Sequence, residues 1–448
     1  MAIQYNSFWL DPNAVPLPWV SILFSILSIG VFLSLRAGGT LDGLPSDPMT
    51  TMSIFHQRST ECLLLSRYWK PKTYTVEALL MNLQGEFVRN EGSELGVWAL
   101  AATATRLAMS MGYHRDPAQY PQISCYQGEM RRRVWAGIVQ LDIFFSFQLG
   151  LPRMIAKGQC DTLPPSNLLD SDFSTDAKEL APSRPETDYT PASYTIAKGR
   201  LLDVFADIAE QSSSVQPRVY RQYLEFDKRL NDAYAAIPEH LKTKDGGEYV
   251  PSSPAILVRR HLLEILYQKS RCILHREYMI KAAPDSPVMY SRSSCVDAAM
   301  VLLREQMIIH QDVQEGGVLR RERWFLNSLH HTDFILAAMI VCLELNFRLD
   351  GGPRQPRLVD ELGRAKYENQ TLIQALCNSR EIWNEWKTMS KVPAQAARLL
   401  SIMLNKAASE YLPNPTQMAT GVGLQRQEAL ELGKSTALTL YQGVFSSY

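Results

Sequence analysis

The sequence predicts an all-α protein, a large bundle of antiparallel helices in two packed halves. Three observations support this class. Apolar residues recur at steps of three and four along most of the 448 residues, which is the spacing of one helical face. Glycines and prolines fall between these stretches, where helices end. No convincing strand run and no repeat of fixed period is present.

The first 19 residues are a lead-in, and we expect the first helix at residues 20–35. This is the only membrane-like run, sixteen residues without a charge but with four serines. A spanning helix needs about 20 residues, and a shorter run is more typical of a buried core helix. No basic residue precedes Arg36 as a signal peptide would require. We therefore predict a core helix and no membrane partner.

Helices are next expected at residues 53–66, 75–88 and 98–111. The last of these has a narrow, mostly alanine face, which lets a partner helix approach closely. Gly112 follows where a helix usually stops, since glycine takes the left-handed cap conformation without strain. The residues of the face are Val97, Ala101, Ala104, Ala108 and Met111.

A wider apolar surface predicts an inner helix at residues 130–147. One carboxylate, Asp142, lies within that surface, and a buried carboxylate needs a cation or hydrogen-bond donors. We expect the cation to be Arg106 or one of Arg131, Arg132 and Arg133. Because three successive arginines point around more than half a helical turn, ion pairs within the bundle fit them better than one flat phosphate patch.

Residues 151–193 change character, and residues 160–192 hold seven acidic side chains, two basic ones and five prolines. Long segments without periodicity are usually functional or disordered. We expect a surface crossing between the two helical halves, residues 20–150 and 194–410, with an acidic activation-type segment as the alternative. Beyond it, helices are expected at residues 196–211, 219–236, 255–280, 296–310, 320–349, 358–389 and 393–410, before a frayed tail at 411–448.

The charge balance argues against direct DNA binding, because 46 basic residues match 46 acidic ones and leave no positive field. The seven cysteines are dispersed, with no Cys-x-x-Cys pair. Such a set indicates reduced intracellular thiols, not a disulfide framework or a zinc site. They are Cys62, Cys125, Cys160, Cys272, Cys295, Cys342 and Cys377.

Several short sequence motifs between residues 98 and 164 resemble those of the fungal-specific transcription factor domain, the regulatory middle homology region of fungal zinc-cluster regulators. Further motifs similar to those of the family, at residues 273–278 and 291–295, extend the resemblance over roughly residues 17–310. The signature residues are Trp98, Arg106, Gly112, His114, Arg115, Asp116, Glu129, Arg131, Arg132, Trp135, Asp142, Gly150, Pro152, Cys160, Asp161 and Pro164.

The resemblance implies a nuclear transcription regulator that controls a metabolic gene set and is not an enzyme. Its partners would be the transcription machinery or another zinc-cluster regulator, with a small-molecule effector and a homodimer also allowed. Family members hold DNA through an N-terminal module of six cysteines and two zinc ions, which this sequence does not contain. DNA contact would then be indirect or through a missing module, and no cofactor is expected unless that module supplies zinc.

Three alternatives stay open. The chain could be an incomplete version of a DNA-binding activator, or a free-standing corepressor or partner subunit. It could also be an all-helical, metal-dependent enzyme similar to terpene cyclases. Asn231, Asp232 and Glu239 match three positions of one of the magnesium-binding motifs of those enzymes. Ala235 replaces the serine of that motif, and Pro238 breaks the helix.

Two shorter motifs have structural interpretations. The order His114, Arg115, Asp116 copies a kinase catalytic loop, but Pro121 stands where that loop needs an asparagine, so a polar helix-exit turn is expected. His330 and His331 lie near Asp333 without zinc-ligand spacing, and we interpret them as core or boundary histidines.

Overall fold

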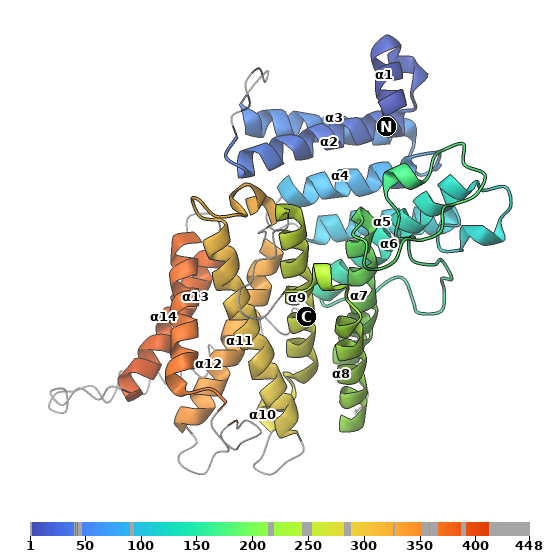
Figure 1. Cartoon of the computed structure of the whole chain (residues 1–448). Coiled ribbons are helices and arrows are strands. Elements are labelled where there is room, and N and C mark those ends of the chain that lie inside the picture. Colours follow the sequence, from blue (N-terminus) through green and yellow to red (C-terminus); the bar gives the residue numbers. More distant parts are fainter. Residues whose placement is uncertain are drawn as a thin grey trace. The chain divides into compact units, whose positions relative to one another are not determined.

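The computed structural model describes residues 2–39, 41, 43, 47–89, 94–213, 219–243, 253–281, 288–325, 328–350, 358, 366–386 and 391–411. Within these ranges the regular secondary structure is helical, without a strand, so the predicted all-α class is confirmed (Figure 1). Contacts divide the chain into two units. The first is Met1–Leu202 with Arg321–Trp324, and the second is Asp203–Arg320 with Phe325–Tyr448.

The first unit contains six whole helices and the first part of a seventh among its described residues. They are α1 (Ala2–Leu10), α2 (Leu17–Arg36), α3 (Pro48–Ser66), α4 (Thr75–Arg89), α5 (Glu94–Ser110), α6 (Cys125–Gln148) and α7 (Pro191–Ser213), with 3-10 turns η1 (Pro12–Ala14), η2 (Pro117–Gln119) and η3 (Asp170–Asp172). Helix α1 lies in the predicted lead-in. Contacts distant in sequence hold it: Phe8 lies 5.9 Å from the ring of Trp19, and Gln4 hydrogen-bonds Tyr74.

Helix α2 contains the predicted apolar segment and packs against α3 and α4. Among the described residues it is the one helix long and apolar enough to cross a membrane, by length and composition only. Trp19, Val20 and Ile22 are buried in the first unit. The prediction of a core helix therefore holds for one side of α2, while Ile26 and Leu27 on another side are exposed.

The second unit holds the rest of α7 and the remaining described helices. They are α8 (Tyr220–Ala235), α9 (Pro254–His275), α10 (Tyr278–Lys281), α11 (Met289–Asp312), α12 (Ser328–Asp350), α13 (Asn369–Trp386) and α14 (Lys391–Tyr411), with the 3-10 turn η4 (Glu239–Leu241). A further 3-10 turn, η5 (Arg320–Phe325), belongs to the first unit except for its two end residues. Neighbouring pairs include α9 with α11, α11 with α12, and α13 with α14. The predicted tail lies outside the described residues from 412 onward.

Three predicted helices of this unit have different bounds. The expected helix at 255–280 divides into α9 and α10. The expected helix at 320–349 begins with the 3-10 turn η5, where Glu322 has non-helical angles (φ −99°, ψ 15°), and α12 starts only at Ser328. The expected helix from Leu358 starts at Asn369, because the Leu358 carbonyl accepts the Lys366 amide at 2.8 Å in a loop; residues 359–365 lie outside the described part.

Candidate functional site

The signature begins at the end of α5, where the chain turns toward α6. Val97, Ala101, Ala104 and Ala108 are buried as predicted. Gly112 has φ +77°, and the Tyr113 amide donates to the Ala108 carbonyl at 3.0 Å. This is the hydrogen bond of a left-handed helix cap, so the predicted stop at Gly112 is confirmed.

Asp116 joins three segments of the first unit. Its carboxylate accepts Nε and Nη2 of Arg132 on α6 at 3.0 and 2.7 Å. It also accepts the amides of Leu163 at 2.9 Å and Ala118 at 3.0 Å. Burial raises the pKa of Asp116, but the guanidinium and the two amides outweigh burial and lower it to about 2.

Asp161 binds the same turn from the segment that follows α6. Its carboxylate accepts the Asp116 amide at 2.8 Å, Gln119 Nε2 at 3.1 Å and Arg115 Nη1 at 3.5 Å. Its own amide donates to the His114 carbonyl at 3.1 Å. The hydrogen bond from the Asp116 amide is the main reason why the pKa of Asp161 is lowered. The His114, Arg115, Asp116 motif is thus a helix-exit turn, as expected.

The three successive arginines of α6 have different partners. Arg132 pairs with Asp116, while Arg133 Nε donates to Glu129 at 2.9 Å and Arg133 Nη1 to Asp170 at 3.0 Å. Arg131 donates to the Met111 carbonyl at 3.2 Å and lies 4.9 Å from the ring centre of Tyr113. The prediction of ion pairs is confirmed for Arg132 and Arg133, whereas Arg131 contacts a backbone carbonyl and an aromatic ring. As expected, the three arginines do not form one flat patch.

Glu129 and Asp142 hold backbone of the following segment, as Asp116 does. Glu129 accepts the Ser166 amide at 3.2 Å. Asp142, 5% exposed, accepts the amides of Met154 at 3.0 Å and Ile155 at 2.9 Å.

The expected arginine partner of Asp142 is therefore wrong. Arg106 is exposed, and Arg131, Arg132 and Arg133 contact other groups. Backbone amides and the Ser146 hydroxyl, at 3.5 Å, supply the donors. A carboxylate that accepts hydrogen bonds from two backbone amides needs no buried cation, so Asp142 does not require an arginine partner.

The other signature residues are mainly structural or lie apart. Gly150 (φ +65°) follows the end of α6. Trp135 is buried, and half-buried Cys160 packs in the same apolar cluster. Trp98 packs in a neighbouring cluster with Phe145. Pro152, Pro164 and Arg106 are exposed.

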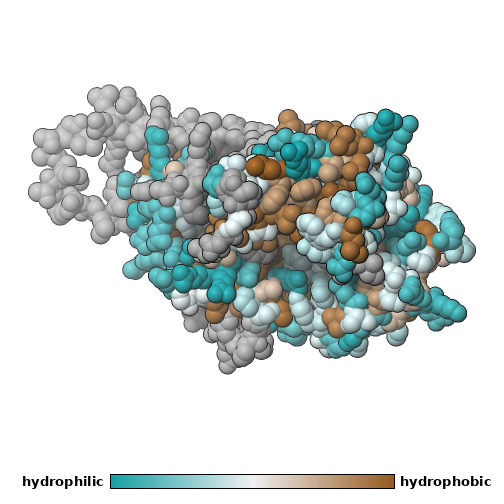
Figure 2. Space-filling view, turned by 90° about the horizontal axis from the view of Figure 1, so that it is seen from above, coloured by the Kyte–Doolittle hydropathy of each residue, from teal (hydrophilic) through white to brown (hydrophobic). Residues whose placement is uncertain are grey.

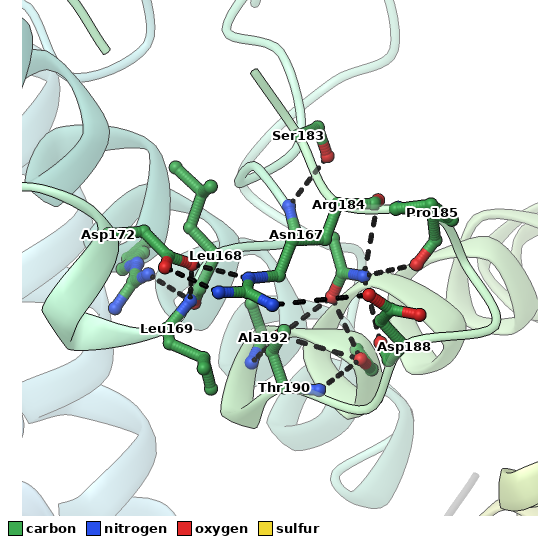
Figure 3. A network of polar contacts seen from close by, with 12 residues as sticks. Asn167, Leu168, Leu169, Asp172, Ser183, Arg184, Pro185, Asp188, Thr190 and Ala192 are labelled. Atoms are coloured by element: carbon green, nitrogen blue, oxygen red, sulfur yellow. Dashed lines mark hydrogen bonds and ion pairs between the residues drawn. The ribbon is translucent and has the colours of Figure 1, made fainter. Parts of the chain in front are cut away.

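Sequence reasoning missed Asn167, which organises the crossing segment (Figure 3). Its Nδ2 donates to the carbonyls of Pro185 at 2.9 Å, Asp188 at 3.0 Å and Arg184 at 3.4 Å. Its Oδ1 accepts the hydroxyls of Thr190 at 2.7 Å and Ser193 at 2.8 Å. No local motif marks Asn167, because its partners lie 16 to 26 residues further along the chain.

An ion pair closes the same loop. Arg184 Nε and Nη2 both donate to Asp172 at 2.7 Å, and the guanidinium lowers the pKa of Asp172 to about 2. Two of the acidic residues that suggested an activation-type segment, Asp172 and Asp161, thus hold the segment in a fixed path. The crossing segment is an ordered part of the first unit.

The second unit contains its own polar cluster where α8, α9 and α11 meet. His275, which is fully buried, lies 3.0 Å from both Asp227 and Ser291. Tyr290 donates to Asp227 at 2.6 Å. Burial raises the pKa of Asp227, but the contacts with His275 and Tyr290 outweigh it and lower the pKa.

A pocket of about 200 Å³ lies beside this cluster, within the second unit. Its lining combines apolar side chains with an arginine, a glutamate and several amide and hydroxyl groups. Ile208, Phe226, Ile273 and Leu274 are the apolar residues, and Gln211, Ser212, Gln222, Tyr223, Arg276 and Glu277 the polar ones.

Asn231 of the magnesium motif, and His331 and Asp333 of the zinc interpretation, contact other side chains of the fold. Asn231 donates to Asp227 at 3.2 Å and accepts the Tyr267 hydroxyl at 2.6 Å. His331 lies against Trp383 and Trp386, and Asp333 pairs with Lys269 at 2.6 Å. Within the ranges that the structure describes, no group of three or more His, Cys, Asp or Glu side chains could hold a metal ion.

The sequence has relatives of known class. The zinc-cluster transcription factor mpsB of Macrophomina phaseolina is 35% identical over 92% of this chain and 55% of its own length. The zinc-cluster transcription factor pigI of Monascus ruber is 35% identical over 92% of this chain and 50% of its own length. The equisetin cluster transcription factor eqxF of Fusarium heterosporum is 32% identical, with shares of 94% and 60%.

The chain therefore spans between half and 60% of the length of these curated relatives. No solved structure matches it significantly. The sequence profile of the fungal specific transcription factor domain matches residues 6–232, about half of the chain and nearly all of the first unit. On this match, the chain belongs to the fungal specific transcription factor domain family.

Proposed function

We propose that the chain is the regulatory part of a transcription regulator that controls a biosynthetic gene cluster in the nucleus. Family membership supports this proposal, as do relatives whose names assign them to the equisetin and pyrrolocin clusters. With no net charge and no close cysteine set in its sequence, the chain would reach DNA through a partner or through a module outside these residues.

One observation favours a regulatory function over an enzymatic one. The carboxylates of the signature bind arginines and backbone amides within the fold, as Asp116 binds Arg132 and Leu163. A catalytic carboxylate must instead reach a substrate proton or a metal ion. We infer that these residues fix the shape of the first unit and act in regulation through that shape.

A reporter assay tests this proposal. The 448-residue chain is fused to a heterologous DNA-binding domain and recruited upstream of a reporter gene in a fungal cell. We expect a several-fold change in transcript, upward for an activator and downward for a corepressor. A reporter level equal to that of the DNA-binding domain alone, with the fusion present in the nucleus, would contradict the proposal.

The pocket of the second unit is our candidate for an effector site. Its mixture of apolar and charged lining groups suits a small amphipathic metabolite. Gln222 is an exposed lining residue, so Gln222→Trp should fill the pocket without disturbing the core. In the reporter assay we expect it to change the output, whereas Leu224→Trp, on the exposed side of α8 and outside the pocket lining, should not.

A further inference from the structure

The connection from α3 to α4 presents apolar and basic side chains together at the surface. Figure 2 shows hydrophobic residues lying beside hydrophilic ones on the side of the molecule where α2 and α3 lie. The three apolar side chains of the connection are 53%, 70% and 55% exposed, and its three basic side chains are exposed as well. We call these six residues the α3–α4 tip: Leu64, Leu65 and Trp69 with Arg67, Lys70 and Lys72.

Backbone hydrogen bonds fold the tip into one compact turn. The Arg67 amide donates to the Leu64 carbonyl at 3.0 Å, and the Lys70 amide donates to the Arg67 carbonyl at 2.7 Å. The second bond closes a four-residue turn, whose end Cα atoms are less than about 7 Å apart. The Lys72 amide donates to Thr75 Oγ1 at 2.9 Å, where α4 begins. The cations and the apolar side chains are therefore neighbours on a single turn of the first unit.

The positive charge of the tip is not compensated within the fold. No acidic residue lies between Glu61 and Glu77 in the sequence. Glu61 is already paired with Arg58 at 2.6 Å, and Glu77 accepts the Tyr113 hydroxyl at 3.2 Å. Within the described part of the chain, no ion pair involves a cation of the tip. The tip thus presents three unneutralised positive charges beside its exposed apolar groups.

The backbone of the tip is strained at Arg67. This residue ends α3 with φ 57° and ψ 58°, a left-handed conformation that glycine adopts without steric cost. Among the described residues, Tyr74 is the other non-glycine residue with positive φ, at 68°, but its ring packs against a buried apolar cluster of the first unit. The Arg67 side chain is exposed instead. Because such strain persists mainly at functional sites, we infer that the arginine is used at the surface.

The number of charges restricts the kind of partner. Proteins that bind nucleic acid commonly neutralise roughly six to ten phosphates. Basic segments that bind anionic lipid hold roughly four to eight Lys or Arg. Three cations are too few for either, but together with three large apolar side chains they complement an amphipathic helix whose apolar face is bordered by carboxylates.

We propose that the α3–α4 tip binds an acidic amphipathic helix of a partner protein. Leu64, Leu65 and Trp69 contact the apolar face of that helix, and the three cations pair with Asp and Glu side chains at its border. The planar guanidinium of Arg67 can bind one carboxylate through two hydrogen bonds. This proposal does not depend on the proposed function.

Fluorescence anisotropy with the 448-residue chain and a labelled synthetic peptide tests the proposal. The peptide has about 18 residues, enough to form a helix on binding, with Leu and Phe on one face and Asp and Glu beside it. The same peptide with Lys at every acidic position is its control. We expect the acidic peptide to bind at least about tenfold more tightly than the basic one, because its charge complements the tip.

Variants of the chain show whether the tip is responsible. Replacing its three cations together, by Arg67→Glu, Lys70→Glu and Lys72→Glu, should reverse the preference between the two peptides. Lys228→Glu, at an exposed residue of α8, should leave the preference unchanged. Trp69→Ala removes an apolar contact but no charge, so it should weaken binding of the acidic peptide without reversing the preference.

Arg67→Gly separates binding from stability. We expect a higher melting temperature, because glycine relieves the left-handed strain, together with several-fold weaker binding of the acidic peptide. Equal binding of the acidic and basic peptides to the wild type would overturn the proposal, as would a preference for the acidic peptide that the triple variant keeps. Tighter binding to phosphatidylserine vesicles or to a DNA duplex than to the acidic peptide, lost in the triple variant, would overturn it too.

Discussion

The carboxylate of Asp116 and the guanidinium of Arg132 meet through two hydrogen bonds, of 2.7 and 3.0 Å, across sixteen residues of chain. Both side chains are shielded from water, with exposed fractions of 6% and 15%. Paired in this geometry, the two groups hold the turn after α5 on α6. The same carboxylate accepts the Leu163 amide, so one acid ties the crossing segment to both helices.

Asp116→Ala should lower the free energy of unfolding by about 3 kcal/mol, since it leaves a shielded guanidinium and two amides without their acceptor. Urea unfolding followed by circular dichroism measures the loss. The matched control is Asp170→Ala, which removes an ion pair to Arg133 whose carboxylate is 85% exposed. There we expect less than about 1 kcal/mol, and equal losses in the two variants would contradict the assigned role of Asp116.

The Asp116 contacts should also be visible in the pH dependence of stability. Because the folded pKa of about 2 lies below the ordinary 3.8, the contribution is present above pH 3.8 and is lost as the pH falls toward 2. The full contribution is roughly 2 kcal/mol, of which about 1 kcal/mol is lost by pH 3. The stability difference between wild type and Asp116→Asn should narrow by that amount between pH 6 and pH 3; a constant difference would exclude the depressed pKa.

Two glycines of the signature region should respond to alanine with opposite signs. Gly112 has φ +77° with open space around it, so Gly112→Ala costs about 1–2 kcal/mol of backbone strain. Gly137, inside α6, also has open space but no positive φ, so Gly137→Ala gains up to about 1 kcal/mol of helix propensity. Thermal melts of both variants measure the sign of each change in stability. A Gly112→Ala variant more stable than the wild type would contradict the left-handed cap at Gly112.

Local patterns in the sequence predicted most of the helices, but they did not predict the contacts between distant segments. The alanine face of α5 and the stop at Gly112 follow from spacing and from glycine's backbone freedom, and both are confirmed. The single long helix expected at 320–349 was wrong, because apolar periodicity does not register the non-helical angles at Glu322. Helix α1 was missed because its order depends on Trp19 and Tyr74, outside its own sequence.

The candidate site shows the same division. The ion pairing of Arg132 and Arg133 followed from their successive positions on one helix, which point their side chains in different directions. The partner of Asp142 did not follow, because the choice between a cation and backbone amides depends on where residues 154 and 155 return. Backbone donors carry no sequence signal, so a carboxylate that binds them looks like an unpaired charge in the sequence.

Asp142→Ala should destabilise the first unit by about 2–4 kcal/mol, because the buried amides of Met154 and Ile155 lose their acceptor. Hydrogen exchange distinguishes this cause from a lost ion pair. We expect amide protection at Met154 and Ile155 to fall more than at the end of α5. Ser146→Ala, which removes only a 3.5 Å contact to the same carboxylate, is the control and should leave the protection nearly unchanged. Protection equal to wild type in Asp142→Ala would contradict the assignment.

Asn167 tests whether the crossing segment is held by one side chain. Asn167→Asp keeps the size and the oxygen that accepts from Thr190 and Ser193, but it replaces the Nδ2 donor that binds the Pro185 and Asp188 carbonyls. A carboxylate facing carbonyl oxygens is repelled, so we expect a loss of about 3 kcal/mol and faster proteolysis between residues 174 and 189. Asp188→Ala leaves the carbonyl in place and removes a 4.0 Å contact to Arg184 and an exposed hydrogen bond from the Thr187 hydroxyl at 3.3 Å, so it should be cleaved at close to the wild-type rate. If Asn167→Asp resists protease as well as the wild type does, the segment is held by its other contacts, chiefly the pair of Asp172 with Arg184.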